Sequence, residues 1–144
     1  MEKTAKIITK DKTLKVKFYE STPATVKNFT ELAGKGFYKN LKFHRVIPGF
    51  VVQGGCPYGT GSGGPGYQIA CECATVTENQ YHQKGVLSMA HAGPNTGGSQ
   101  FFIVLDRNNT AHLDGNHTCF GEVTEGLEHL DSIAQGDTFS VELD

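Results

Sequence analysis

The sequence predicts a mainly β protein built from eight short strands and two helices. Apolar and polar residues alternate with a period of two in the candidate strands, which indicates strands with one buried face. Glycine, proline, asparagine and aspartate residues separate these runs and predict turns. Two windows instead have the apolar spacing of a helix. Short strands joined by turns are typical of a β-sandwich or a closed barrel, and periodicity does not choose between these two architectures.

The first two strands are predicted to form a hairpin across a turn at residues 11–12. Ile8 belongs to the strand before the turn, and apolar residues alternate with lysines from Leu14 to Phe18 after it. Because successive side chains point to opposite faces of a strand, the apolar residues share one face. Six further strands are expected at 43–47, 50–54, 86–90, 100–105, 119–123 and 138–143.

The first helix is predicted between the second and third strands. Thr22 is the expected N-cap, and Pro23 follows at the first helical position, where its missing N–H is tolerated. Glycine is expected to end the helix at Gly34 or Gly36. The apolar residues that share one face of this helix are Val26, Phe29, Leu32 and Ala33.

The second helix is predicted from about Thr124 to Gln135. Gly136 lies just beyond its expected end, as is common at a helix C-terminus. Its apolar residues are in helical register on one face: Leu127, Leu130, Ile133 and Ala134.

Length and composition fit a single domain spanning residues 1–144. A chain of 144 residues can bury a core without disulfide or metal support. The formal net charge of -2 gives no basis for nucleic-acid binding. No apolar run approaches the roughly 20 residues that cross a bilayer, and Met1–Thr4 contains no apolar leader. We therefore expect a cytoplasmic protein with no nucleic-acid or membrane partner.

Four cysteines are expected to be reduced thiols: Cys56, Cys71, Cys73 and Cys119. Cys71 and Cys73 lie two residues apart, so on a strand their side chains would point the same way. This arrangement leaves open a soft-metal site or a redox pair. However, a structural zinc site uses four ligands and usually a Cys-x-x-Cys spacing, so no metal is expected.

A glycine-rich segment at residues 59–66 formally matches the G-x-G-x-x-G pattern of dinucleotide-binding proteins. That pattern requires a helix directly after it, whereas Pro65-Gly66 ends the run and Tyr67 begins an extended stretch. The segment is better interpreted as a surface loop beside a ligand. No phosphate-binding loop is present, and Ser99 lacks the nucleophile-elbow pattern, so neither a cofactor nor hydrolase chemistry is expected.

Residues 43–55 place one arginine and one glutamine among apolar residues that otherwise resemble two buried strands. A guanidinium group is costly to desolvate, so Arg45 either turns to solvent or lies at a cavity where it binds something. Strand alternation puts Arg45 on one face with its apolar neighbours and puts Val51 on one face with Gln53. The two polar side chains can therefore meet on one surface beside Phe50.

Three segments carry a resemblance to a known family: FHRVIPGFVVQGG at 43–55, LSMAHAGPNTGGSQFFI at 87–103 and LDGNHTCFG at 113–121. Together they resemble the cyclophilin family of peptidyl-prolyl cis/trans isomerases, in particular the short bacterial-type members, from about Ala5 to Glu142. The resemblance implies a closed eight-stranded antiparallel β-barrel with an α-helix capping each end. It also implies a cofactor-free isomerase that acts on proline-containing peptides and on unfolded or flexible protein segments.

The resemblance also implies a role for each site residue. Arg45 matches the catalytic arginine, and Gln53 matches the glutamine that binds the substrate backbone and orients that arginine. The proline pocket corresponds to Phe50, Val51, Phe102, Leu113 and His117, of which Phe50 and His117 are counted with the catalytic group. The groove for the residues before proline corresponds to Gly61, Ala90, His91, Ala92 and Gln100.

Three positions depart from the best-known eukaryotic pattern. His91 stands where asparagine is usual, and Val51 stands where methionine is usual. His112 stands where tryptophan often binds cyclosporin, so only weak cyclosporin binding is expected. His44 is interpreted as a structural neighbour of Arg45. His82 is expected to be an exposed polar residue.

Two classes of function fit these residues. The first is an isomerase that assists protein folding, and the second is a proline-peptide binding or chaperone module with incidental catalysis. In either case the protein is expected to be a monomer. Arg45 favours the enzyme, because a binding module would not need the arginine.

Overall fold

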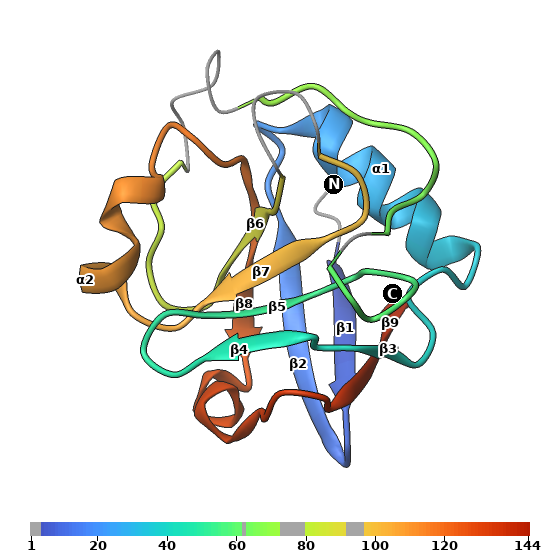
Figure 1. The fold of residues 1–144 in the computed structure, drawn as a ribbon. Coiled ribbons are helices and arrows are strands. Elements are labelled where there is room, and N and C mark those ends of the chain that lie inside the picture. Colours follow the sequence, from blue (N-terminus) through green and yellow to red (C-terminus); the bar gives the residue numbers. More distant parts are fainter. Residues whose placement is uncertain (1–3, 62, 73–79, 92–96) are drawn as a thin grey trace.

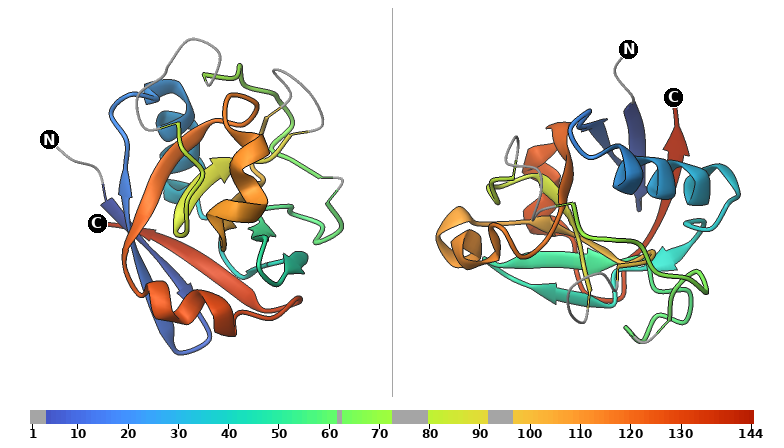
Figure 2. Two further views of the ribbon diagram at one scale, coloured as in Figure 1. Left: turned by 90° about the vertical axis from the view of Figure 1, so that its left-hand side faces the viewer. Right: turned by 90° about the horizontal axis from the view of Figure 1, so that it is seen from above.

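A computed structural model describes residues 4–61, 63–72, 80–91 and 97–144 of the chain, and within them the fold is mainly β (Figure 1). The described strands form one antiparallel sheet in the order β3-β9-β1-β2-β8-β6-β7-β5-β4. Figure 2 shows that this sheet is strongly curled. The strands are β1 (Thr4–Thr9), β2 (Lys12–Phe18), β3 (Leu41–Lys42), β4 (Arg45–Ile47), β5 (Val51–Gly54), β6 (Val86–Met89), β7 (Phe101–Val104), β8 (Cys119–Glu125) and β9 (Thr138–Leu143).

The predicted N-terminal hairpin is confirmed as β1 and β2. Ile7 pairs with Leu14 and Ala5 with Val16, and all four side chains are buried. The turn lies at residues 10–11, one residue earlier than expected, because Lys10 adopts a positive φ of 55°. The lysines between the apolar residues face outward, so the alternation in the sequence directly reports the buried face.

The prediction of eight strands is wrong in number, because the described sheet has nine. The additional strand is β3, which precedes the expected strand at 43–47, and that expected strand is shortened to β4. Phe43 leaves the ladder and exchanges backbone hydrogen bonds with the 136–137 turn, accepting from Gly136 N at 2.9 Å and donating to Asp137 O at 2.8 Å. Its ring stacks on Phe139 with centroids 4.3 Å apart. The chain therefore bends here, so that β3 pairs with β9 and β4 pairs with β5, at opposite ends of a curled half-barrel.

The first predicted helix is confirmed as α1 (Pro23–Gly34), but Thr22 does not cap it with its side chain. The Thr22 hydroxyl is buried and has no hydrogen-bond partner among the described residues. The cap comes instead from Glu72, whose carboxylate accepts hydrogen bonds from Thr25 N at 2.7 Å, Thr25 Oγ1 at 2.5 Å and Ala24 N at 3.4 Å. A negative charge at this end is favourable, because the helix dipole is positive there.

The second predicted helix is wrong in type and length. Residues 124–125 still belong to β8, and the helical part is a 3-10 helix, η2 (Leu127–Ser132). Gly126 separates the two elements with a φ of 97°, and a Cβ at this position would lie 2.7 Å from Thr13 O. Beyond Ser132 the backbone of Ile133 is extended, so only this six-residue 3-10 helix covers this end of the sheet.

Two short helical elements, α2 (Arg107–Thr110) and η1 (Ala111–Leu113), were not expected from the sequence. Asp106 caps α2 by accepting a hydrogen bond from Asn108 N at 2.8 Å. An aspartate before a short polar run is an N-cap signal, but four residues carry too little periodicity to predict a helix. Both elements lie on the connection from β7 to β8 (Figure 1).

The main core fills the inside of the curled sheet, with α1 at the top of Figure 1 and η2 at the bottom. Phe29 of α1 contacts the rings of four buried aromatic residues: Phe18, Tyr38, Phe101 and Phe120. Val52 and Ile103 also belong to this core, whereas Val51 and Phe102 belong to a second cluster. Because side chains alternate along β5 and β7, this second cluster lies on the other face of the sheet. None of the described helices is long and apolar enough to cross a membrane.

Replacing Glu72 with alanine is expected to lower the free energy of unfolding by about 1 to 2 kcal/mol, because two backbone N–H groups of α1 lose their acceptor. Chemical denaturation followed by circular dichroism measures this difference. Glu31→Ala is the matched control, since Glu31 is an exposed glutamate within the same helix. Equal stability of the Glu72→Ala and Glu31→Ala variants would contradict the capping role.

Candidate active site

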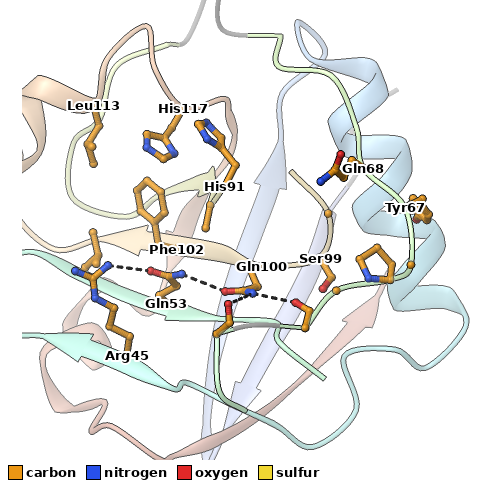
Figure 3. Close-up of a pocket in the computed structure, with 18 of the residues that line it drawn as sticks. Arg45, Gln53, Tyr67, Gln68, His91, Ser99, Gln100, Phe102, Leu113 and His117 are labelled. Carbon is orange, nitrogen blue, oxygen red and sulfur yellow. Dashed lines mark hydrogen bonds between the residues drawn. The ribbon is translucent and has the colours of Figure 1, made fainter. Parts of the chain in front are cut away.

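Three neighbouring strands place three side chains in a row on the second face of the sheet. Arg45 of β4 lies directly opposite Gln53 of β5, and Gln53 lies directly opposite Phe102 of β7. Residues paired in this way present their side chains on the same face. The row borders a cavity of about 900 Å³, most of whose lining residues are drawn in Figure 3. A cation, an amide and an aromatic ring are thus adjacent.

A chain of hydrogen bonds fixes the polar part of this row. Arg45 NH1 donates to Gln53 Oε1 at 3.4 Å, and Gln53 Nε2 donates to Gln100 Oε1 at 3.3 Å. Gln100 Nε2 in turn donates to the carbonyl oxygens of Gly61 at 2.8 Å and Gly63 at 2.9 Å. The glycine-rich loop therefore anchors the far end of a relay that ends at the guanidinium group (Figure 3).

Apolar side chains form the wall next to Arg45. Val51 and Phe102 are buried, and Phe50 and Leu113 are half-buried beside them. Arg45 itself is exposed, and its bond to Gln53 leaves its other N–H groups available to the cavity. The arrangement can hold a compact apolar ring while a cation donates hydrogen bonds to polar atoms next to that ring.

Two stacked histidines form another part of the wall. The ring centroids of His91 and His117 lie 4.1 Å apart, and the two rings are nearly parallel. The rings of His117 and Phe102 also contact each other, in an edge-to-face arrangement. Burial lowers the pKa of His117, and the neighbouring His91 lowers it further. The imidazole is therefore neutral at pH 7, and its Nδ1–H donates to Met89 O at 2.9 Å. His91 Nε2 donates to Asn116 O at 2.7 Å.

The far part of the cavity was not identified from the sequence. It is bordered by Pro65, Gly66, Tyr67, Gln68, Gly98 and Ser99. Asn28 of α1 ties two sides of this region together, because its amide Nδ2 donates to Gly98 O at 2.8 Å and its Oδ1 accepts from the Tyr67 hydroxyl. The only sequence signal for this region was the prediction of a loop beside a ligand.

Most of the predicted site residues come together around this cavity: Arg45, Phe50, Val51, Gln53, Gly61, Ala90, His91, Gln100, Phe102, Leu113 and His117. Ala92 lies outside the described residues. His112 is not part of the cavity wall, but its ring stacks on Phe50 with centroids 6.2 Å apart and an angle of 13° between the planes. Because His112 is also exposed, it lies at the rim of the cavity, next to Phe50.

The structure also places two further histidines, His44 and His82. His44 has a half-buried ring whose pKa is lowered by burial and by the adjacent Arg45, so it is neutral beside the arginine. The expectation that His82 is exposed is wrong, because the side chain is fully buried and both ring nitrogens have polar partners. Over the described residues, no three histidine, cysteine or acidic side chains are grouped to hold a metal ion. Cys73 of the Cys71-Glu72-Cys73 segment lies outside the described residues.

The curled antiparallel sheet thus carries an arginine and a glutamine beside an apolar pocket. A family model described as cyclophilin type peptidyl-prolyl cis-trans isomerase/CLD matches residues 4–143. The chain therefore belongs to the cyclophilin family of peptidyl-prolyl cis-trans isomerases, and the predicted enzyme class is confirmed.

Curated relatives and solved structures support the same family assignment. The chain is 59% identical over 118 residues to peptidyl-prolyl cis-trans isomerase B of Bacillus subtilis (strain 168), covering 82% of this chain and 80% of the relative. It is 57% identical over 122 residues to a peptidyl-prolyl cis-trans isomerase of Helicobacter pylori (strain ATCC 700392 / 26695), covering 83% and 72%. A crystal structure of a Cryptosporidium parvum cyclophilin type isomerase in the presence of the dipeptide Ala-Pro superposes with a TM-score of 0.87 at 34% identity, covering 98% of each chain.

Stability is expected to fall as the pH is lowered from about 7 toward 5. The pKa values of His44, His82 and His117 all lie below their ordinary value in the folded protein. The unfolded chain takes up protons below about pH 6.5, whereas these folded rings resist protonation, so acid favours the unfolded state. Thermal unfolding at pH 7.5, 6.5 and 5.5 measures the effect.

His117→Gln is expected to show a smaller loss of Tm over the same pH range, because one of the resisting groups is gone. His129→Gln serves as the control, since His129 is partly exposed and remote from the cavity wall. A Tm that stays constant or rises on acidification would show that the buried histidines do not govern this range.

Proposed function

We propose that this chain accelerates rotation about X-Pro peptide bonds without a covalent step, with Arg45 as the catalytic group. The amide is planar by resonance and its rotational barrier is about 18 to 20 kcal/mol. In the twisted amide conjugation is lost and the prolyl nitrogen gains lone-pair character. A positioned cation that donates a hydrogen bond stabilises that state more than the planar one, and this difference lowers the barrier.

The row of Arg45, Gln53 and Phe102 on adjacent strands is the observation that carries this proposal. Phe102 and its apolar neighbours would hold the proline ring, and Gln53 would hold the substrate backbone while it restrains the guanidinium group. His117 would close the pocket with a neutral ring, which keeps the environment of the proline apolar. A binding module would need the apolar wall but not the arginine aimed at it.

The groove that leads to this pocket would take the residues before proline. Gly61, Ala90, His91, Ala92 and Gln100 are the residues proposed for it, and all of the described ones border the cavity. The relative crystallised in the presence of Ala-Pro supports proline-containing peptides as ligands. We extend the proposal to unfolded or flexible protein segments, hence to assistance in folding, because they expose X-Pro bonds to such a groove.

We further propose one domain over residues 1–144, acting as a monomer in the cytoplasm. One continuous sheet and a shared core support the single domain. The buried free thiol of Cys56 is typical of a reducing compartment. For the sheet we propose a closed barrel. Its two edge strands, β3 and β4, are separated by only two residues of chain, which supports closure because the two edges must lie near each other.

Arg45→Ala is expected to lower kcat/KM by roughly 10 to 1,000-fold, the range for loss of a positioned transition-state donor. The affinity for a substrate peptide should fall much less, because the apolar wall supplies most ground-state binding. NMR exchange spectroscopy on a short X-Pro peptide measures both quantities.

Arg45→Lys is the matched variant, since it keeps the charge but removes the planar, multiply donating group. It should recover only part of the activity. Near-normal turnover by folded Arg45→Ala protein would reject Arg45 as the catalytic group, and an inactive wild-type protein would reject the proposed activity itself.

Cyclosporin is expected to bind weakly, and His112→Trp is expected to tighten its binding by about 30 to 150-fold, or roughly 2 to 3 kcal/mol. An indole at the rim adds apolar area and one N–H donor, whereas the imidazole stacked on Phe50 covers less area and is more strongly hydrated. Turnover of a small peptide should change little, because His112 is outside the cavity wall. Calorimetric titration tests this, and nanomolar binding by the wild-type protein would contradict it.

A further inference from the structure

We propose that Asp114 is a positioning residue that fixes the wall of the proline pocket from behind, through the buried ring of His82. This inference rests on the proposed function and adds to it a side chain that does not border the cavity. The carboxylate ties the residues before β6, which are distant in sequence, to the start of α2 and to the nearby loop that carries Leu113 and His117.

The Asp114 carboxylate has a partner for each oxygen. Its Oδ1 accepts from His82 N at 2.8 Å and from His82 Nδ1 at 2.8 Å, and its Oδ2 accepts from Arg107 NH1 at 2.6 Å. Arg107 is held in turn by the His82 carbonyl oxygen at 3.2 Å and by the Tyr81 ring, whose centroid lies 3.6 Å away. The hydrogen bonds from His82 and Arg107 hold the pKa of Asp114 below its ordinary value, so the carboxylate is charged. Charge-assisted bonds of this kind are short and strongly directional.

These contacts orient His82 against the pocket wall. The ring is fully buried and stacks on Phe102, with centroids 5.8 Å apart and an angle of 18° between the planes. Phe102 also meets the edge of His117, so its ring contacts two imidazoles. Burial lowers the pKa of His82 despite the carboxylate, so the ring is neutral, with its proton on the Nδ1 that faces Asp114. Its Nε2 is then an acceptor for the hydroxyl of Ser88 at 2.8 Å, and that hydroxyl is shared with Thr118 O at 3.3 Å.

Ser88, His82 and Asp114 thus have the hydrogen-bond order of a serine hydrolase triad, but they cannot act as one. The side chains of Ser88 and His82 are fully buried, and none of the three residues borders the cavity. A substrate carbonyl therefore has no route to the serine. The arrangement holds a ring in one orientation, which is a structural task rather than a nucleophilic one.

Asp114 also fixes the front of the pocket through its own loop. Leu113 and His117 both border the cavity, and the carbonyl oxygen of Leu113 accepts from His117 N at 3.2 Å and Asn116 N at 3.0 Å. These two bonds close the tight turn at 113–117 and link Leu113 directly to His117. The Asp114 side chain is bonded to His82, which stacks on Phe102, and the Asp114 backbone lies within the 113–117 turn. Asp114 therefore fixes the position of Phe102 relative to Leu113 and His117.

Asp114→Asn tests this role, because the amide keeps the shape but loses the charge and presents an N–H group toward His82. A looser pocket binds the proline ring less well in both planar and twisted forms, so KM and the peptide Kd should rise roughly 5 to 30-fold while kcat changes less than threefold. Partial unfolding would have the opposite signature, a lower apparent kcat with unchanged KM. Asp131→Asn is the matched control, since Asp131 is also an ion-paired carboxylate but is exposed and bonded to Lys84.

The measurements are NMR exchange on an Ala-Pro tetrapeptide for kcat and KM, calorimetric titration for Kd, and thermal unfolding for the folded fraction. Should Asp114→Asn fail to fold, His82→Gln is used, because it removes the ring that stacks on Phe102 and is expected to raise KM and Kd similarly. KM and Kd within twofold of wild type in a folded variant would overturn the role of Asp114. A wild-type protein that binds the peptide without turnover would reject the proposed activity, and the Kd comparison would still decide the role of Asp114.

Discussion

The pairing of β4, β5 and β7 is the constraint on which the rest of the structure depends. In this register Val52, Phe101 and Ile103 point into the main core, and Arg45, Gln53 and Phe102 necessarily point to the other face. A slip of one residue would exchange the two sets and remove both the core and the site. Stability and function therefore depend on the same hydrogen-bond ladder, because the register that buries the apolar residues also determines the position of the Arg45 guanidinium group.

Behind this ladder, polar groups hold parts that the ladder does not reach. Gln100 connects the glycine-rich loop to the glutamine beside Arg45, Asn28 connects α1 to the far side of the cavity, and Asp114 connects the pocket wall to α2. Each of these side chains bonds to at least two segments that are distant in sequence. Most of their partners are backbone groups or buried rings, which have little freedom to move. The loops that border the cavity are consequently each hydrogen-bonded to another part of the fold.

The sequence predicted what depends on local pattern. The hairpin of β1 and β2, the course of α1 and the meeting of Arg45 with Gln53 all follow from alternation or helical spacing. What it missed depends on distant contacts: the cap on α1 comes from Glu72, and the burial of His82 depends on Asp114 and Arg107. The second helix was overestimated because apolar spacing cannot report the left-handed backbone of Gly126, which follows β8 and delays the start of the helical segment to Leu127. The far side of the cavity was missed because residues 65–68 have no periodicity that points to a surface.

The cap on α1 has a consequence for local opening of the protein. Glu72 holds the first turn of the helix, and Tyr67, five residues earlier, bonds to Asn28 near its middle. The segment from 67 to 72 thus lies along the helix and supplies two of its polar contacts. Fraying of the helix start and lifting of this segment therefore break the same bonds, so the two belong to one cooperative unit of native-state hydrogen exchange. A peptide that rests against Tyr67 in the groove would slow amide exchange in the first turns of α1, although it never touches them.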